Sequence, residues 1–209
     1  GRTDYEYATS HLGGLNMTNA ELLNVERVKI IAAGTSYHAG MVAAYLLESL
    51  ARVPASAELA SEVRYRNPIV ERNTVYFAVS QSGETADTLY AMRELQRKGA
   101  RVLGICNVVG ATIPRESDGG VYIHSGPEIA VASTKAFTSQ LTAFYLFALL
   151  IARMRDMSYE NGVQFLDALE GVPDAVSGVL LNQQDHIMEL ARKYSDAEDF
   201  LFLGRGINY

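Results

Sequence analysis

Short apolar runs alternate along the chain with segments whose apolar residues recur every three to four positions. The runs that predict buried strands lie at 28–33, 55–59, 74–79, 102–106 and 121–124, and the one at 55–59 is the weakest. Helical periodicity marks 36–52, 86–98 and 133–155. Uniformly apolar strands that alternate with helices are typical of parallel sheets. The pattern therefore predicts an α/β fold with a doubly wound, five-stranded parallel sheet and helices on both faces.

The pattern changes after Arg155. Two or three helices are expected over 160–198, with polar junctions at Asn161-Gly162 and Gly171-Val172-Pro173. Phe200–Leu203 is a new apolar run that predicts a further strand. We therefore expect a lead-in, a first domain, a helical linker and the start of a truncated second domain, at 1–27, 28–158, 159–198 and 199–209.

Composition and charge narrow the class of protein. The 209 residues are 48% hydrophobic and 20% charged, which is typical of a globular chain rather than a disordered one. The net charge of −6 speaks against a nucleic-acid partner. The apolar run Leu141–Ala152 is too short to cross about 30 Å of hydrocarbon, so we expect no membrane partner.

The cysteine and histidine residues indicate neither a disulfide nor a metal site. Cys106 is the single cysteine, which predicts a small core residue and a reducing compartment, and hence a cytoplasmic protein. The four histidines lack metal-ligand spacing, and we expect His38 on a helix surface.

The segment Ser80–Thr85, with the sequence SQSGET, is the strongest candidate for a binding site. It lies between a predicted strand and a predicted helix, and helix N-termini bind phosphate readily. Ser80, Ser82 and Thr85 supply hydroxyl groups, and Gly83 lets the backbone approach a ligand closely. The segment contains no lysine, so it is not a nucleoside-triphosphate loop. The alternative is a solvated turn in which Ser82 caps the helix.

Gly34-Thr35-Ser36 repeats this arrangement after the first predicted strand. It lacks the GxGxxG pattern of dinucleotide-binding loops, since Tyr37 and His38 follow. The alternative is again an ordinary N-cap, provided by Thr35 or Ser36. Two hydroxyl-rich loops at the ends of parallel strands favour a binding site more than either loop alone.

The segment before the long predicted helix adds a third candidate. Ser133 and Thr134 could cap this helix, whereas Lys135 in its first turn opposes the helix macrodipole. A bound anion would explain this lysine, and the alternative is a surface lysine paired with Glu128 or Glu84.

These motifs together resemble a known family. The four segments that carry the resemblance occur in order at Ala33–His38, Glu58–Glu62, Ser80–Leu89 and Gly126–Ala136. They are similar to the isomerase half of the glutamine–fructose-6-phosphate aminotransferases (glucosamine-6-phosphate synthases), which contains two sugar isomerase (SIS) domains. The resemblance covers nearly the whole chain, and Leu203–Gly206 is similar to the start of the second SIS domain. It implies an SIS-type sheet, a flavodoxin-like three-layer sandwich.

The resemblance also implies a substrate and a site. The substrate is fructose 6-phosphate, and the product is glucosamine 6-phosphate for hexosamine biosynthesis. The residues implied in sugar-phosphate binding are Gly34, Thr35, Ser36, Ser80, Gln81, Ser82, Thr85, Val131, Ala132 and Ser133. Lys135 and Glu84 are auxiliary candidates. The family usually has cysteine at the position of Ala33, but its chemistry does not depend on that thiol.

The family's catalytic groups have no match in this chain. The glutaminase cysteine is absent, and the isomerisation residues belong to the second SIS domain, beyond Tyr209. We therefore expect a domain that binds substrate without turning it over, with no catalytic residue, cofactor or metal of its own. The resemblance implies a homodimer formed through SIS domains. Two alternatives stay open, a stand-alone sugar-phosphate-sensing module and a complete isomerase of another SIS family. The residues at 58–62 and 132–136 favour the aminotransferase over both.

Overall fold

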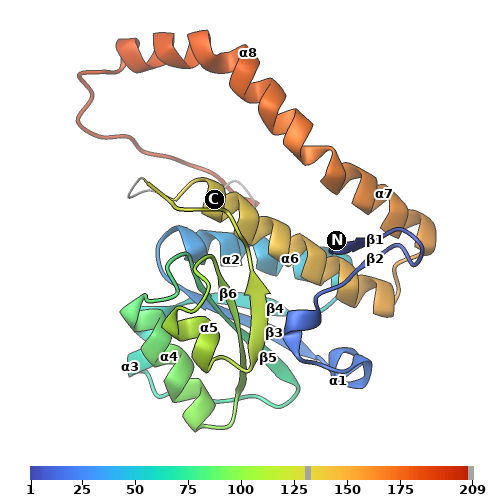
Figure 1. Ribbon diagram of the computed structural model, residues 1–209. Coiled ribbons are helices and arrows are strands. Elements are labelled where there is room, and N and C mark those ends of the chain that lie inside the picture. The colour runs from blue at the N-terminus through green and yellow to red at the C-terminus, as the bar shows by residue number, and fades with distance from the viewer. Residues whose placement is uncertain (130–132, 207–209) are drawn as a thin grey trace.

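The computed structural model describes residues 1–129 and 133–206 and has a parallel sheet at its centre (Figure 1). The most apolar run forms the middle strand β5 (Thr74–Ser80), in which all seven residues are buried. The other four strands are β3 (Arg27–Ala32), β4 (Ala55–Leu59), β6 (Arg101–Cys106) and β7 (Gly119–Tyr122). Their order is β4-β3-β5-β6-β7, and every pair is parallel. The predicted five-stranded, flavodoxin-like sheet is confirmed, because the first of these strands lies between the second and the third.

Helices cover both faces of this sheet, because side chains of a strand point alternately to either side. Ile30 of β3 packs in a core with α2 (Thr35–Leu46) and α6 (Lys135–Met154). Ile31, the next residue, packs in a second core with α3 (Ala60–Tyr65), α4 (Ala86–Arg97) and α5 (Thr112–Glu116). Figure 1 shows the two sets of helices on opposite sides of the strands. The predicted helix over 36–52 is α2 followed by a π segment, η2 (Leu47–Ala51).

α6 fills most of the first core. The ring of Phe77 in β5 meets Phe144 and Phe147 of α6 edge to face, with centroids 5.5 and 4.9 Å apart. By length and composition α6 could cross a membrane, but more than half of its most apolar stretch is buried inside the fold. Packing against the sheet therefore accounts for its apolar composition.

The lead-in is held against α6. A hairpin of two short strands, β1 (Thr3–Asp4) and β2 (Thr9–Ser10), precedes the single turn η1 (Gly13–Leu15) and α1 (Asn19–Leu23). α1 begins with a capping box of Thr18 and Glu21, whereas the hairpin has no clear signal in the sequence. Ser10 Oγ donates a buried hydrogen bond of 2.7 Å to the Leu146 carbonyl, which fixes the hairpin to α6.

Two helices follow the sheet domain, α7 (Tyr159–Glu170) and α8 (Val172–Lys193). The predicted junction at Asn161-Gly162 is wrong, since both residues lie inside α7. Gly162 is tolerated there because it packs on the lead-in, where a Cβ would come within 2.5 Å of the Ala8 carbonyl oxygen. Every residue of α8 is described, and none is buried, as this helix extends away from the sheet domain (Figure 1).

The strand predicted at Phe200–Leu203 is also wrong. These four side chains are between 62 and 89% exposed, and the residues have no regular secondary structure. A strand needs a neighbour to pair its backbone groups, and none of the described residues lies beside this segment as a strand. The apolar composition alone therefore does not make it a strand.

Replacing a buried ring of the first core tests this packing. We expect Phe147→Ala to lower the free energy of unfolding by about 3–5 kcal/mol, because it leaves a cavity beside Phe77 and Phe144. Leu181→Ala on α8 is the matched control, since Leu181 is 80% exposed and its loss is expected to cost within about 0.5 kcal/mol. Urea unfolding of both variants measures the difference, and similar losses in the two would contradict the assignment of the core.

Candidate functional site

The sheet register brings two of the predicted loops to one edge. Ala32, at the end of β3, pairs with Val79, near the end of β5. The turn at Ala33-Gly34 (the Gly34 loop) and the segment Ser80–Thr85 (the Ser80 loop) therefore leave neighbouring parallel strands at their carboxyl ends. Open α/β sheets bind their ligands at this edge.

The Gly34 loop turns the chain from β3 directly into α2. Gly34 is the N-cap residue, and its φ of +56° is one that residues with side chains rarely adopt. Thr35 and Ser36 lie within the first turn of the helix, so the alternative in which either acts as the N-cap is wrong. Thr35 is exposed and Ser36 is buried. Because first-turn N–H groups have no acceptor within a helix, this turn offers both N–H and hydroxyl donors.

The side chain of Ser80 forms hydrogen bonds within the Ser80 loop. It is buried, and its Oγ accepts a hydrogen bond of 3.0 Å from the Gly83 N–H. The same Oγ lies 2.8 Å from Thr85 Oγ1. Ser80 therefore fixes two other residues of the loop, and its own contact with a ligand stays a prediction.

Ser82 is not the N-cap of α4. This helix begins at Ala86 with Thr85 as its N-cap residue. The Ser82 Oγ instead accepts a hydrogen bond of 3.2 Å from the Glu84 N–H. The alternative role as a helix cap is wrong, because the turn of the Ser80 loop separates Ser82 from the helix. Gln81 and Ser82 are half-buried, and Ser82 Oγ also lies 3.5 Å from Ser80 Oγ. When Ser80 donates in this contact, the Ser82 hydroxyl proton is available to a ligand.

Gly83 lets the Ser80 loop pack tightly on the start of α5. Its φ is +69°, and a Cβ at this position would lie 2.6 Å from Ala111 Cβ. Its carbonyl accepts a hydrogen bond of 2.9 Å from the Ile113 N–H. The Glu84 carboxylate accepts one of 2.6 Å from the Thr112 N–H, and hydrogen bonding to Thr112 lowers the pKa of Glu84.

Asn107 connects the Ser80 loop to the segment 123–129, which follows β7. Its N–H donates to the Gln81 carbonyl at 3.1 Å. Its side-chain amide donates to the Gly126 carbonyl and accepts from the Ser125 N–H, both at 2.7 Å. No motif in the sequence includes Asn107, although a polar residue directly after an apolar strand is a usable signal, and Asn107 is buried.

Glu128 provides the cap of α6. Its carboxylate accepts hydrogen bonds from the Ala136 N–H at 3.0 Å and from the Thr134 and Ser133 hydroxyls at 3.2 and 3.4 Å. Thr134 occupies the N-cap position, as predicted for one of the two candidates, but its side chain makes no cap bond. The hydrogen bond from Ala136 is the main cause of the lowered pKa of Glu128, and the positive charge of the exposed Lys135 adds to it.

The other residues considered in the sequence are either outside the described part of the chain or have no role at the carboxyl edge. Val131 and Ala132 lie outside the described residues. Cys106 is buried, and burial raises its pKa to about 12, so its thiol is an inert core group, as expected. His38 is exposed on α2, as expected. In the ranges 1–129 and 133–206, no group of three or more His, Cys, Asp or Glu side chains could hold a metal ion.

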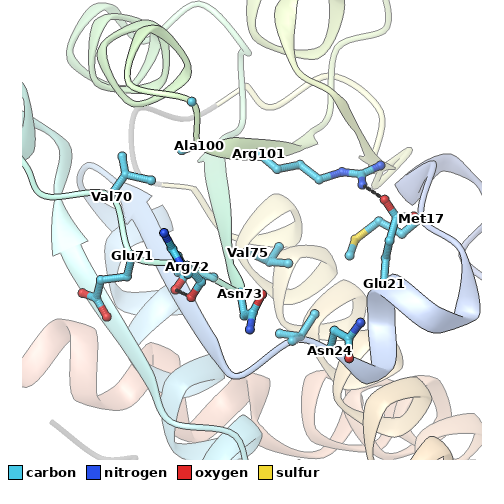
Figure 2. A pocket seen from close by; sticks show the side chains of 13 residues that line it. Met17, Glu21, Asn24, Val70, Glu71, Arg72, Asn73, Val75, Ala100 and Arg101 are labelled. Atoms are coloured by element: carbon cyan, nitrogen blue, oxygen red, sulfur yellow. Dashed lines mark hydrogen bonds and ion pairs between the residues drawn. The ribbon is translucent and has the colours of Figure 1, made fainter.

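A cavity of about 400 Å³ opens at the opposite edge of the sheet, between α1 and the segments that lead into β5 and β6 (Figure 2). Three of its four charged side chains, Glu21, Glu71 and Arg101, are in ion pairs, whereas Arg72 has none with a described residue. Arg101 Nη1 lies 2.6 Å from Glu21 Oε1, and Glu71 accepts from Arg27 and Lys29 at 2.8 and 2.5 Å. The hydroxyl-rich loops that follow β3 and β5 lie at the carboxyl edge, which therefore remains the candidate site.

The carboxyl edge therefore has the chemistry of an anion site. Two helix N-termini and several hydroxyls lie at the ends of adjacent strands, and such groups bind phosphate without a cation. The acids beside them are poor general bases, because Glu84 and Glu128 have lowered pKa values and are hydrogen-bonded to backbone N–H groups. The arrangement favours binding of a phosphate over proton transfer.

A parallel sheet with this strand order and helices on both faces defines the class of flavodoxin-like α/β domains. Within this class the chain belongs to the SIS domain family, whose model matches residues 21–150. It is 49% identical over its full length to a glutamine–fructose-6-phosphate aminotransferase [isomerizing] of Chlorobaculum tepidum, and 48% identical over 90% of its length to that of Streptomyces coelicolor. It spans about a third of the length of these relatives, 34 and 31%.

A comparison with solved structures also finds an aminotransferase of this kind. The C-terminal domain of glucosamine-fructose-6-phosphate aminotransferase from Francisella tularensis is 37% identical to the chain and superposes with a TM-score of 0.89. The match covers 97% of this chain and 56% of that one.

Substitution of Gly83 tests the packing of the Ser80 loop. Gly83→Ala is expected to destabilise the protein by at least about 2 kcal/mol, through a positive φ and a clash with Ala111. Gly99→Ala is the matched control, because Gly99 has a φ of +86° but open space around its Cβ position. Urea unfolding should give a smaller loss for Gly99→Ala, of about 1 kcal/mol. Equal losses would mean that Ala111 does not confine the loop.

Proposed function

We propose that this chain is the sugar-phosphate-binding SIS domain of a glutamine–fructose-6-phosphate aminotransferase, and that its carboxyl edge binds the phosphate of fructose 6-phosphate. The observation that carries the proposal is the pair of hydroxyl-rich loops that follow β3 and β5, in a chain 49% identical to such an enzyme. The longer protein would make glucosamine 6-phosphate from fructose 6-phosphate and glutamine, for hexosamine biosynthesis.

In this proposal the Ser80 loop and the first turn of α2 share the phosphate. Ser82 and Thr85 donate from their hydroxyls, and the N–H groups of Thr35 and Ser36 donate from the helix start. Backbone and hydroxyl donors would bind the dianion through the two helix N-termini, so a lysine is not required. The sugar hydroxyls would meet Thr35 and the segment 131–133, as the family resemblance implies.

The proposed role of this chain is binding and orientation, and other parts of the longer protein would supply the chemistry. Isomerisation moves a proton between C1 and C2 of the sugar, and this needs a base with a pKa near the working pH. Glu84 and Glu128, the acids beside the loops, have lowered pKa values. We also propose a homodimer formed through SIS domains and a cytoplasmic location, which the family resemblance and the buried single cysteine support.

Removal of one hydroxyl from the Ser80 loop tests the phosphate site. We expect Ser82→Ala to weaken the affinity for fructose 6-phosphate about 10- to 100-fold, since a hydrogen bond to a charged group contributes roughly 1.5–3 kcal/mol. Isothermal titration measures the affinity, and the melting temperature should change little. Ser49→Ala is the control, because Ser49 is exposed on η2 and bonds only to the Leu46 carbonyl among the described residues. Equal affinities for Ser82→Ala and the parent would remove this loop from the site.

A second measurement tests whether the chain binds without turnover. The purified chain should bind fructose 6-phosphate but form no glucosamine 6-phosphate from glutamine or from added ammonia. Product analysis after long incubation checks this expectation. Sustained formation of product from ammonia, abolished by Ser82→Ala, would show that a catalytic base lies within these 209 residues.

A further inference from the structure

Gln140 is a buried amide in an otherwise apolar part of α6. Only 1% of the residue is exposed. Its side chain reaches α2, where Nε2 donates a hydrogen bond of 2.9 Å to Ser36 Oγ. Its Oε1 is buried and has no hydrogen-bond partner among the described residues. Gln140 is therefore the direct link between the core helix α6 and the first turn of the candidate site.

A buried amide of this kind is costly for stability alone. An unpaired buried acceptor loses its hydration without a compensating bond, and such exceptions in folded proteins usually have a specific cause. An apolar side chain of similar length would fill the same space beside Ala136 and Phe144 without that cost. The hydrogen bond to Ser36, the one that the Gln140 side chain makes with a described residue, is thus the feature that needs a reason.

The direction of that bond determines what Ser36 can do. A serine hydroxyl has one proton and two lone pairs. Because the amide N–H donates to Ser36 Oγ, it occupies a lone pair and leaves the hydroxyl proton for another acceptor. If the hydroxyl instead donated its proton to an amide oxygen, its lone pairs would remain for the ligand, and these repel a phosphate. The amide donor of Gln140 therefore keeps Ser36 a donor.

We propose that Gln140 is a positioning residue of the phosphate site, which holds Ser36 Oγ in place and directs its proton to the phosphate. This inference rests on the proposed sugar-phosphate function. Gln140 itself does not touch the ligand, since it is buried behind the first turn of α2. Its effect on affinity must therefore pass through the Ser36 hydroxyl.

A double-mutant cycle tests this route, with fructose 6-phosphate as the probe and titration calorimetry as the measurement. Gln140→Met removes the donor and keeps the length of the side chain, and we expect it to weaken binding on the order of 10-fold. Ser36→Ala should weaken binding at least as much. The double variant should bind as Ser36→Ala does, within about 2-fold, because without the hydroxyl Gln140 has nothing to position.

Two further variants protect the test from a loss of structure. Gln140→Asn keeps an amide but is too short to reach Ser36, so it should weaken binding as Gln140→Met does. Gln164→Met, at an exposed position on α7, should bind as the parent does. Circular dichroism and the melting temperature establish that each variant is folded before its affinity is compared.

The outcomes separate this inference from the proposed function. If the parent chain does not bind fructose 6-phosphate, the proposed function is wrong. The proposed role of Gln140 is then wrong as well. If the parent binds but folded Gln140→Met and Gln140→Asn bind equally well, only the role of Gln140 is overturned. The same holds if Gln140→Met weakens binding as strongly in the Ser36→Ala background as in the parent, because that result indicates a general structural effect.

Discussion

The parallel pairing of β3 with β5 is the constraint on which the candidate site depends. All of β5 and the last three residues of β3 are buried, so these residues must satisfy two cores at once, as Ile30 and Ile31 do. A slip of one residue would exchange the two faces and place Phe77 away from the rings of α6. The same register that preserves both cores sets the ends of β3 and β5 side by side. The two hydroxyl-rich loops therefore start from fixed, neighbouring positions.

The loops are organised before any ligand arrives. Ser80 and Glu84 use their side chains to hold backbone N–H groups, and Asn107 joins the Ser80 loop to the segment after β7. Groups that are already ordered lose little conformational entropy on binding, which favours affinity. Several polar residues at this edge thus contribute by building the loops, so the number of hydroxyls in the sequence overstates the number available to a phosphate.

The sequence predicts the sheet well and the details of the site less well, for physical reasons. Apolar runs predict β3, β5 and β6 because a strand buried on both faces has little choice of composition. The edge strand β4 contains no buried residue, which is why its run is the weakest of the five. The same reasoning fails at Phe200–Leu203, since a strand also needs a neighbouring backbone. The capping role of Ser82 fails because hydroxyl density does not fix where a helix begins. Gln140 could not be paired with Ser36, because these residues are 104 positions apart and meet only through the fold.

The two layers of helices divide the support of the site between them. On one face, α5 holds the Ser80 loop through Thr112 and Ile113. On the other face, α6 holds the first turn of α2 through Gln140, and it is itself capped by Glu128 from the segment that follows β7. Since α6 also carries the aromatic core, the packing that stabilises the sheet and the contact that orients Ser36 belong to one helix. The geometry of the candidate site is therefore a consequence of how both layers pack on the sheet, rather than a property of the loop sequences alone.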